Sequence, residues 1–130
     1  MGEKESKIKS YIASVVRKYL PKHEEIIHSG IFLILSKEED LEIPDWYHNG
    51  YSVISETISC FLQNLCKSRT VTFSGDCLYK ITTDDIGIPA EDLEKAKLNL
   101  DTFLADYETG IQIVKEANRV FKFGSMGVVG

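Results

Sequence analysis

The chain has 130 residues, of which 43% are hydrophobic and 27% are charged, and its formal net charge at pH 7 is −5. This length is typical of one domain, and the composition is that of an ordinary globular protein, which argues against global disorder. The longest apolar run, residues 30–35, is far too short to cross a membrane as a helix.

The charges are unevenly distributed along the chain. Residues 1–22 carry six Lys or Arg and two Glu, a net charge of +4, whereas residues 23–62 carry one Lys and eight acidic residues, a net charge of −7. An acidic body is poorly suited to nonspecific binding of nucleic acid, because phosphates require a basic face. Only the basic N-terminal segment could supply such a face, so contact with a nucleic acid or a membrane surface through it is kept as an alternative function.

Cysteine usage and the N-terminal sequence both bear on cellular location. The three cysteines, Cys60, Cys66 and Cys77, are odd in number and form no CxxC pair. This pattern argues against a disulfide framework and favours a reducing compartment. The N-terminus carries no apolar stretch typical of a signal peptide. The sequence therefore predicts a cytoplasmic protein.

The first half of the chain predicts a helix, a hairpin and a loop. Apolar residues recur at helical spacing over residues 4–20, and Pro21 would end that helix. Residues 23–35 are interpreted as a β-hairpin that turns at a Ser-Gly pair, with one buried helix as the alternative. Residues 36–50 predict a loop that ends in an Asn-Gly turn signal.

The second half predicts two helices, a hairpin and an ambiguous end. Residues 51–67 have one apolar helical face, and residues 69–82 alternate as a hairpin around a Ser-Gly-Asp turn. Pro89 would open a third helix that Gly110 would cap. Residues 111–123 suit either a hairpin or a short helix. The segment 124–130 is Gly-rich and predicts a flexible tail.

These elements predict an α+β fold with one domain over residues 1–123, in the order helix, β-hairpin, helix, β-hairpin, helix, followed by the ambiguous end. This order of elements resembles that of type III secretion chaperones and their relatives. The resemblance implies a protein that binds other proteins and catalyses no reaction.

The segment 42–51 is the strongest candidate for a binding surface. It combines acidic residues with the only Trp and two of the six Tyr at a predicted turn, and aromatic side chains of this kind often dominate binding energy. Trp46 has the alternative interpretation of a core residue beneath the next helix. The predicted contact surface for another, basic protein consists of Glu42, Asp45, Trp46, Tyr47, Tyr51 and Glu56.

A second resemblance concerns the same segment. Residues 43–47, Ile-Pro-Asp-Trp-Tyr, resemble the Leu-Pro-acid-aromatic-aromatic entry to the inhibitory helix of barstar-type inhibitors. Of the two acids that this family places on the following helix, Glu56 would remain, and Ser52 stands in the other position. The resemblance implies a role for Glu56 in contacting a basic partner.

The candidates for catalysis and metal binding are weaker. His23 and His28 are five residues apart, which does not fit the spacing of helical metal ligands, and no acidic run has the ligand spacing of a calcium loop. We therefore expect a non-enzymatic protein-binding module of the chaperone, inhibitor, immunity or regulatory type, without catalytic residues, cofactor or metal, either monomeric or a homodimer. The alternative is a small enzyme or ligand-binding protein with a site around Cys60 or the acidic loops.

Overall fold

The structure is a computed structural model that describes residues 2–37, 43–73, 75, 78–81 and 87–129. Five helices and two small antiparallel hairpins lie within these ranges, and the expected α+β class is confirmed. In chain order the elements are α1 (Gly2–Tyr19), α2 (Glu24–Lys37), β1 (Trp46–His48), β2 (Val53–Ser55), α3 (Glu56–Lys67), β3 (Val71–Phe73), β4 (Tyr79–Ile81), α4 (Ala90–Phe103) and α5 (Gly110–Val129).

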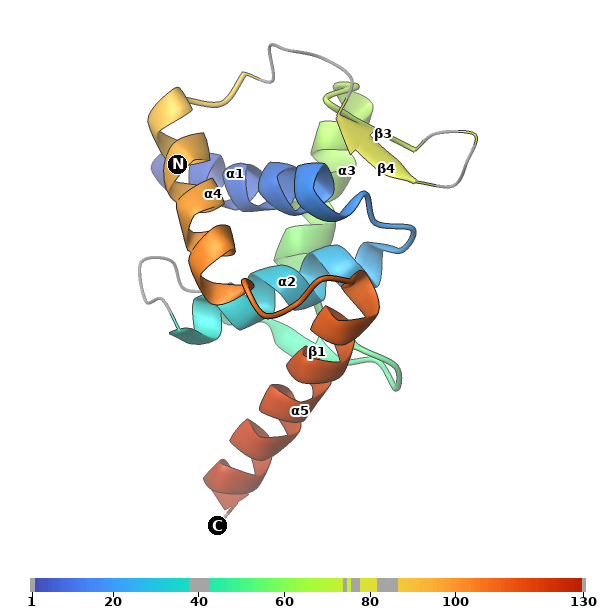
Figure 1. Cartoon of the computed structure of the whole chain (residues 1–130), viewed down its shortest axis with the longest axis vertical. Helices are drawn as coiled ribbons and strands as arrows, with labels where there is room; N and C mark the ends of the chain where they lie inside the picture. Colours follow the sequence, from blue (N-terminus) through green and yellow to red (C-terminus); the bar gives the residue numbers. More distant parts are fainter. Residues whose placement is uncertain (1, 38–42, 74, 76–77, 82–86, 130) are drawn as a thin grey trace.

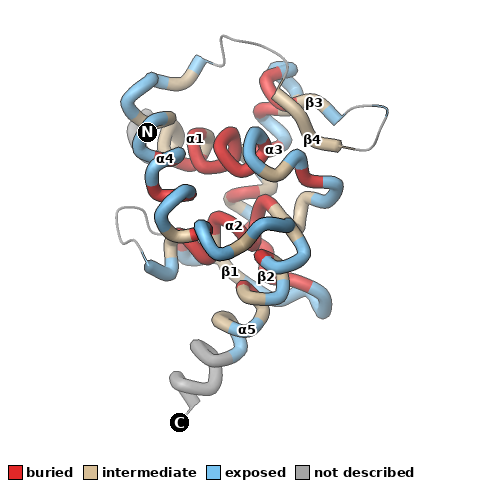
Figure 2. Tube along the Cα trace, in the orientation of Figure 1, coloured by how far each residue is buried: buried red, intermediate tan, exposed pale blue. Residues whose placement is uncertain are grey.

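Helices α1 and α2 form the centre of the molecule, and buried residues are concentrated on them (Figure 2). Helix α1 packs mainly against α4, and α2 packs mainly against α5 (Figure 1). The helix predicted for residues 4–20 is confirmed. It ends where Leu20 adopts a positive φ of 44° before Pro21. Ser10 and Ser14 on this helix are buried, and each hydroxyl donates to the carbonyl four residues earlier.

The hairpin predicted for residues 23–35 is wrong, and the alternative of one buried helix is correct. The Ser-Gly pair that suggested a turn lies within α2, and both residues are buried. Gly30 faces α1 and α4: a Cβ at this position would lie 3.4 Å from Val15 Cγ2 and 3.7 Å from Leu104 Cδ1. The glycine therefore serves a close helix contact, and tertiary packing outweighs its low helix propensity.

The first hairpin turns at Asn49-Gly50. The helix expected over residues 51–67 therefore begins later than predicted, at Glu56. Strands β1 and β2 pair with Trp46 opposite Ser55, and α3 follows β2 directly. Asn49 closes the turn, because its Oδ1 accepts hydrogen bonds from the backbone N–H groups of Tyr51 and Ser52. Gly50 has a φ of +100°, which a glycine adopts without strain.

The positions of α2 and of the first hairpin weaken the resemblances to type III secretion chaperones and to barstar-type inhibitors. Two helices now precede the first hairpin, which differs from the element order on which the likeness to type III secretion chaperones rests. In barstar-type inhibitors the acid-aromatic segment leads into a helix, whereas here Trp46 and Tyr47 lie in β1 and a hairpin separates them from α3.

The second hairpin and the third predicted helix are confirmed. Strands β3 and β4 pair with Val71 opposite Ile81, and the rings of Phe73 and Tyr79 pack edge to face at 4.9 Å. Pro89 directly precedes α4. Of the predicted Ser-Gly-Asp turn, residues 74 and 76 lie outside the described residues.

Helix α5 resolves the ambiguous end of the chain in favour of a helix. The hairpin alternative for residues 111–123 is wrong. Gly110 begins α5 instead of capping α4, and a Cβ there would lie 2.5 Å from Ile26 Cδ1, so the close approach to α2 favours glycine. The helix continues to Val129 and extends away from the other elements (Figure 1). The helix therefore includes most of the segment 124–130. The flexibility predicted for that segment stays a prediction.

Candidate functional site

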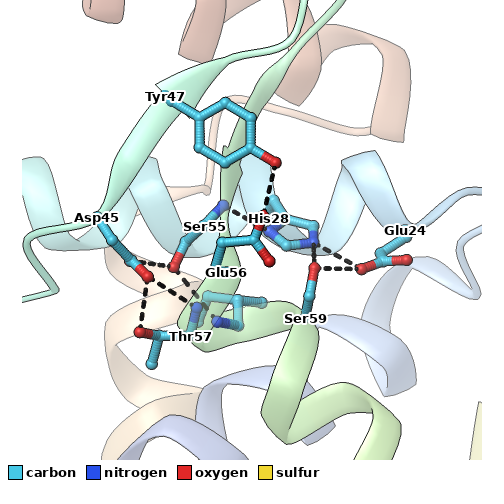
Figure 3. Close-up of polar contacts among 9 residues, drawn as sticks. Glu24, His28, Asp45, Tyr47, Ser55, Glu56, Thr57 and Ser59 are labelled. Carbon is cyan, nitrogen blue, oxygen red and sulfur yellow. Dashed lines mark hydrogen bonds and ion pairs between the residues drawn. The ribbon is translucent and has the colours of Figure 1, made fainter.

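A chain of polar contacts joins α2 to the start of α3 beneath the first hairpin (Figure 3). His28, on α2, is fully buried. Its Nδ1 accepts a hydrogen bond of 3.1 Å from the backbone N–H of Ser55. Its Nε2 lies 2.9 Å from Glu24 Oε1, and the hydroxyl of Ser59 donates to the same carboxylate oxygen at 2.8 Å. The imidazole therefore links one helix to the junction between β2 and α3.

The hydrogen bonds fix the tautomer of the His28 imidazole, that is, which ring nitrogen carries the proton. A backbone N–H can only donate, so Nδ1 accepts and the ring proton lies on Nε2, where it donates to Glu24. The Ser59 hydroxyl is 3.4 Å from Nε2 but faces a nitrogen that already carries a proton. This nitrogen cannot act as a base toward Ser59, so the Ser-His-Glu cluster lacks the arrangement of a nucleophilic triad.

Asp45 holds the start of α3 from across the hairpin. Its Oδ1 accepts a hydrogen bond of 2.6 Å from the Ser55 hydroxyl, and its Oδ2 accepts from the N–H and the hydroxyl of Thr57, each at 2.9 Å. Ser55 is the N-cap of α3 and its hydroxyl accepts from the N–H of Ile58. A carboxylate at this position also interacts favourably with the helix dipole.

Two carboxyl groups in this network have lowered pKa values. For Glu24, the hydrogen bond from His28 makes the largest contribution and outweighs burial, which acts in the opposite direction. For Asp45, burial raises the pKa, but the hydrogen bonds from Ser55 and Thr57 together outweigh it. Both groups are therefore bound more strongly as carboxylates than as neutral acids.

We expect the free energy of unfolding to fall at acidic pH. The folded-state pKa values of Glu24 and Asp45 lie below their ordinary values of 4.5 and 3.8, so their stabilisation is complete above those values and is lost as the pH falls through the folded pKa values. Urea unfolding at a series of pH values from neutral to strongly acidic measures this loss. The double variant Glu24→Gln, Asp45→Asn should lose less stability over the acid range than the wild type, and an equal loss would contradict the assignment.

Of the other five predicted contact residues, one is packed, three are exposed and one lies outside the described residues. Trp46 is half-buried, and its ring packs edge to face on Phe32 at 5.2 Å, so it lies between its two interpretations. Tyr47 and Glu56 are exposed and share a hydrogen bond of 3.2 Å. Tyr51, in the hairpin turn, is 78% exposed. Glu42 lies outside the described residues.

Helix α5 braces the turn of the first hairpin. Asn118 donates from Nδ2 to the carbonyl of Tyr51, and its Oδ1 lies 3.2 Å from His48 Nε2. His48 Nδ1 accepts from the N–H of Gly50 inside the turn. The ring of Phe121 lies 6.0 Å from both His48 and Phe32. The hairpin is therefore fixed between α2, α3 and α5.

The alternative catalytic and metal sites gain little from the geometry. Cys60 is exposed rather than buried, and Cys77 lies outside the described residues. Burial raises the pKa of the half-buried Cys66 thiol, with a smaller contribution from the charge of Glu24, which opposes thiolate formation. Within the described ranges, no group of three or more His, Cys, Asp or Glu side chains could hold a metal ion. No described helix is long and apolar enough to span a membrane.

The roles of His28, Ser55 and Ser59 were not predicted from the sequence. A usable signal was present, because Glu24 and His28 are four residues apart and would face one another on a helix. The hairpin interpretation of residues 23–35 placed Glu24 and His28 on a strand, where they would not face one another.

Comparisons with protein-family models, with curated proteins and with solved structures found no match for this chain.

Proposed function

We propose that this protein is a non-enzymatic binding module whose contact surface is the first hairpin together with the start of α3. The exposed members of this surface are Tyr47, Tyr51 and Glu56. The observation that carries the proposal is that exposed aromatic and acidic side chains sit on a firmly braced backbone. Tyrosine on a rigid support supplies contact area at little entropic cost.

The support for this surface comes from both of its ends. Asp45 and His28 hold the junction between β2 and α3, and Asn118 of α5 holds the turn. Asp45 and Trp46, both predicted as contact residues, are engaged in these internal contacts and are assigned a positioning role in the proposal. The carboxylate of Glu56 gives the surface an acidic group that favours a basic partner protein.

Site-specific photo-crosslinking tests the proposal in cells that express the full chain. A benzophenone amino acid replaces Tyr51, which is 78% exposed, and a matched variant carries it at Ile111, which is 67% exposed on α5. The expected result is one dominant crosslinked protein from position 51 that is absent from position 111. The same crosslink should be at least about tenfold weaker when Glu56→Lys is added, because charge reversal at an interface costs several kcal/mol.

Circular dichroism and thermal unfolding check that each variant is folded. Because all three substituted side chains are exposed, the free energy of unfolding of each variant should stay within about 0.5 kcal/mol of the wild-type value. Crosslinks of equal strength from positions 51 and 111, or a dominant crosslink that is indifferent to Glu56→Lys, would overturn the proposal.

A further inference from the structure

A surface groove lies between α1 and α4, remote in sequence from the first hairpin. Its volume is about 510 Å³, which is within the range of small-molecule sites. The groove has an apolar base at Leu93, which is partly exposed, and it is also lined by Leu100, which is 1% exposed. Its remaining lining residues are Ser14, Arg17, Lys18, Glu94, Lys97 and Asp101.

Three polar contacts join the two helices along their length. The Ser6 hydroxyl donates to Asp92, Asn99 donates to the buried hydroxyl of Tyr11, and Lys18 pairs with Asp101 at 3.4 Å. These contacts occur in the same order along both helices. They hold α1 and α4 in a fixed arrangement, so the groove is a preformed feature of the fold.

The charges in the groove are not balanced. Three of its lining residues are cations and two are acids, and one cation, Lys18, is already paired with Asp101. Among the described residues, Arg17 and Lys97 make no ion pair with the remaining acid, Glu94. Two cations from different helices thus lie beside an apolar base. An anionic group with an apolar body would neutralise the first and cover the second.

We propose that the groove between α1 and α4 binds a small amphiphilic carboxylate, with its anionic group at Arg17 and Lys97 and its apolar chain against Leu93. The site is separate from the hairpin surface, and it stands whether or not that surface binds a protein.

Titration of the ¹⁵N-labelled full chain with octanoate tests the site by NMR. The expected result is a saturable shift of amide resonances in α1 and α4 around residues 14–18 and 93–101. Octanol, which has the same chain length without the charge, should bind at least about tenfold more weakly, since it cannot form charge-assisted hydrogen bonds with Arg17 and Lys97. Lys97→Gln and Arg17→Gln should each weaken octanoate binding about tenfold for the same reason.

Lys115→Gln, which removes an exposed cation from α5, is the matched control and should bind octanoate like the wild type. Equal binding of octanol and octanoate, or equal binding by the Lys97→Gln and Lys115→Gln variants, would overturn the proposal. Shifts confined to other elements would do the same. If phosphatidylserine vesicles bind α1 and octanoate does not, the basic residues contact a membrane surface and the proposed ligand is wrong.

Discussion

Replacing His28 with alanine is expected to lower the free energy of unfolding by about 3–5 kcal/mol, a large part of the stability of a domain of this size. The imidazole is fully buried and joins α2 to the junction of β2 and α3. Alanine leaves a cavity, removes the acceptor of the buried Ser55 N–H and removes the donor to Glu24. Urea unfolding followed by circular dichroism measures the change.

Two polar substitutions separate the contributions of the two ring nitrogens. Asparagine at position 28 can place an oxygen near the position of Nδ1 and keep an acceptor for Ser55. Glutamine can place an NH₂ near the position of Nε2 and keep a donor for Glu24. Because the Ser55 N–H is buried while the Glu24 carboxylate can reach water, His28→Asn should retain more stability than His28→Gln. A loss below about 1 kcal/mol in His28→Ala would contradict the assigned role.

Replacing Asp45 with alanine is expected to cost about 2–3 kcal/mol, because one carboxylate accepts three hydrogen bonds at the start of α3 and part of that gain is offset by its solvent exposure. Ser55 and Thr57 would both lose their partner. Thermal and urea unfolding at neutral pH measure the effect. Asp45→Asn keeps one acceptor oxygen and should lose less.

Asp106→Ala is the matched control for this substitution, since Asp106 is exposed and follows α4 without a hydrogen bond to the described residues. It should change stability by less than about 0.5 kcal/mol. If Asp45→Ala were as stable as the control, Asp45 would be free to serve as a contact residue, as predicted from the sequence. A loss confined to Asp45→Ala supports the positioning role.

The elements with a single dominant pattern could be predicted from the sequence. Three patterns each indicate a single kind of structure, and the predicted element was confirmed in each case. They are the apolar stripe over residues 4–20, the alternation over residues 69–82 and the position of Pro89. Residues 23–35 failed because they are buried on nearly all sides in α2. A helix that is apolar all round carries no periodic signal that distinguishes it from buried strands.

Which of the predicted contact residues are exposed could be predicted from the sequence only in part, for a physical reason. Tyr47, Tyr51 and Glu56 are exposed, as a contact surface requires. The internal contacts of Asp45 and Trp46 were not predicted. Trp46 packs on Phe32, which lies in another element, and Asp45 binds the start of α3, which was predicted at the wrong residue. The N-cap role of Ser55 was hidden because residues 51–54 continue the apolar pattern of α3 into β2. Tertiary hydrogen bonds of this kind leave no local trace in one sequence.

The pairing of α1 with α4 and of α2 with α5 has a consequence for how the chain acquires its structure. Partners such as Tyr11 and Asn99 are 88 residues apart, so the contacts that join these helix pairs close very long loops. Contacts of this kind slow folding, since chain entropy is lost before the contacts form. During synthesis, the apolar faces of α1 and α2 emerge from the ribosome before their main partners exist. We therefore expect folding to be completed only after α5 is released, with chaperones shielding the N-terminal half until then.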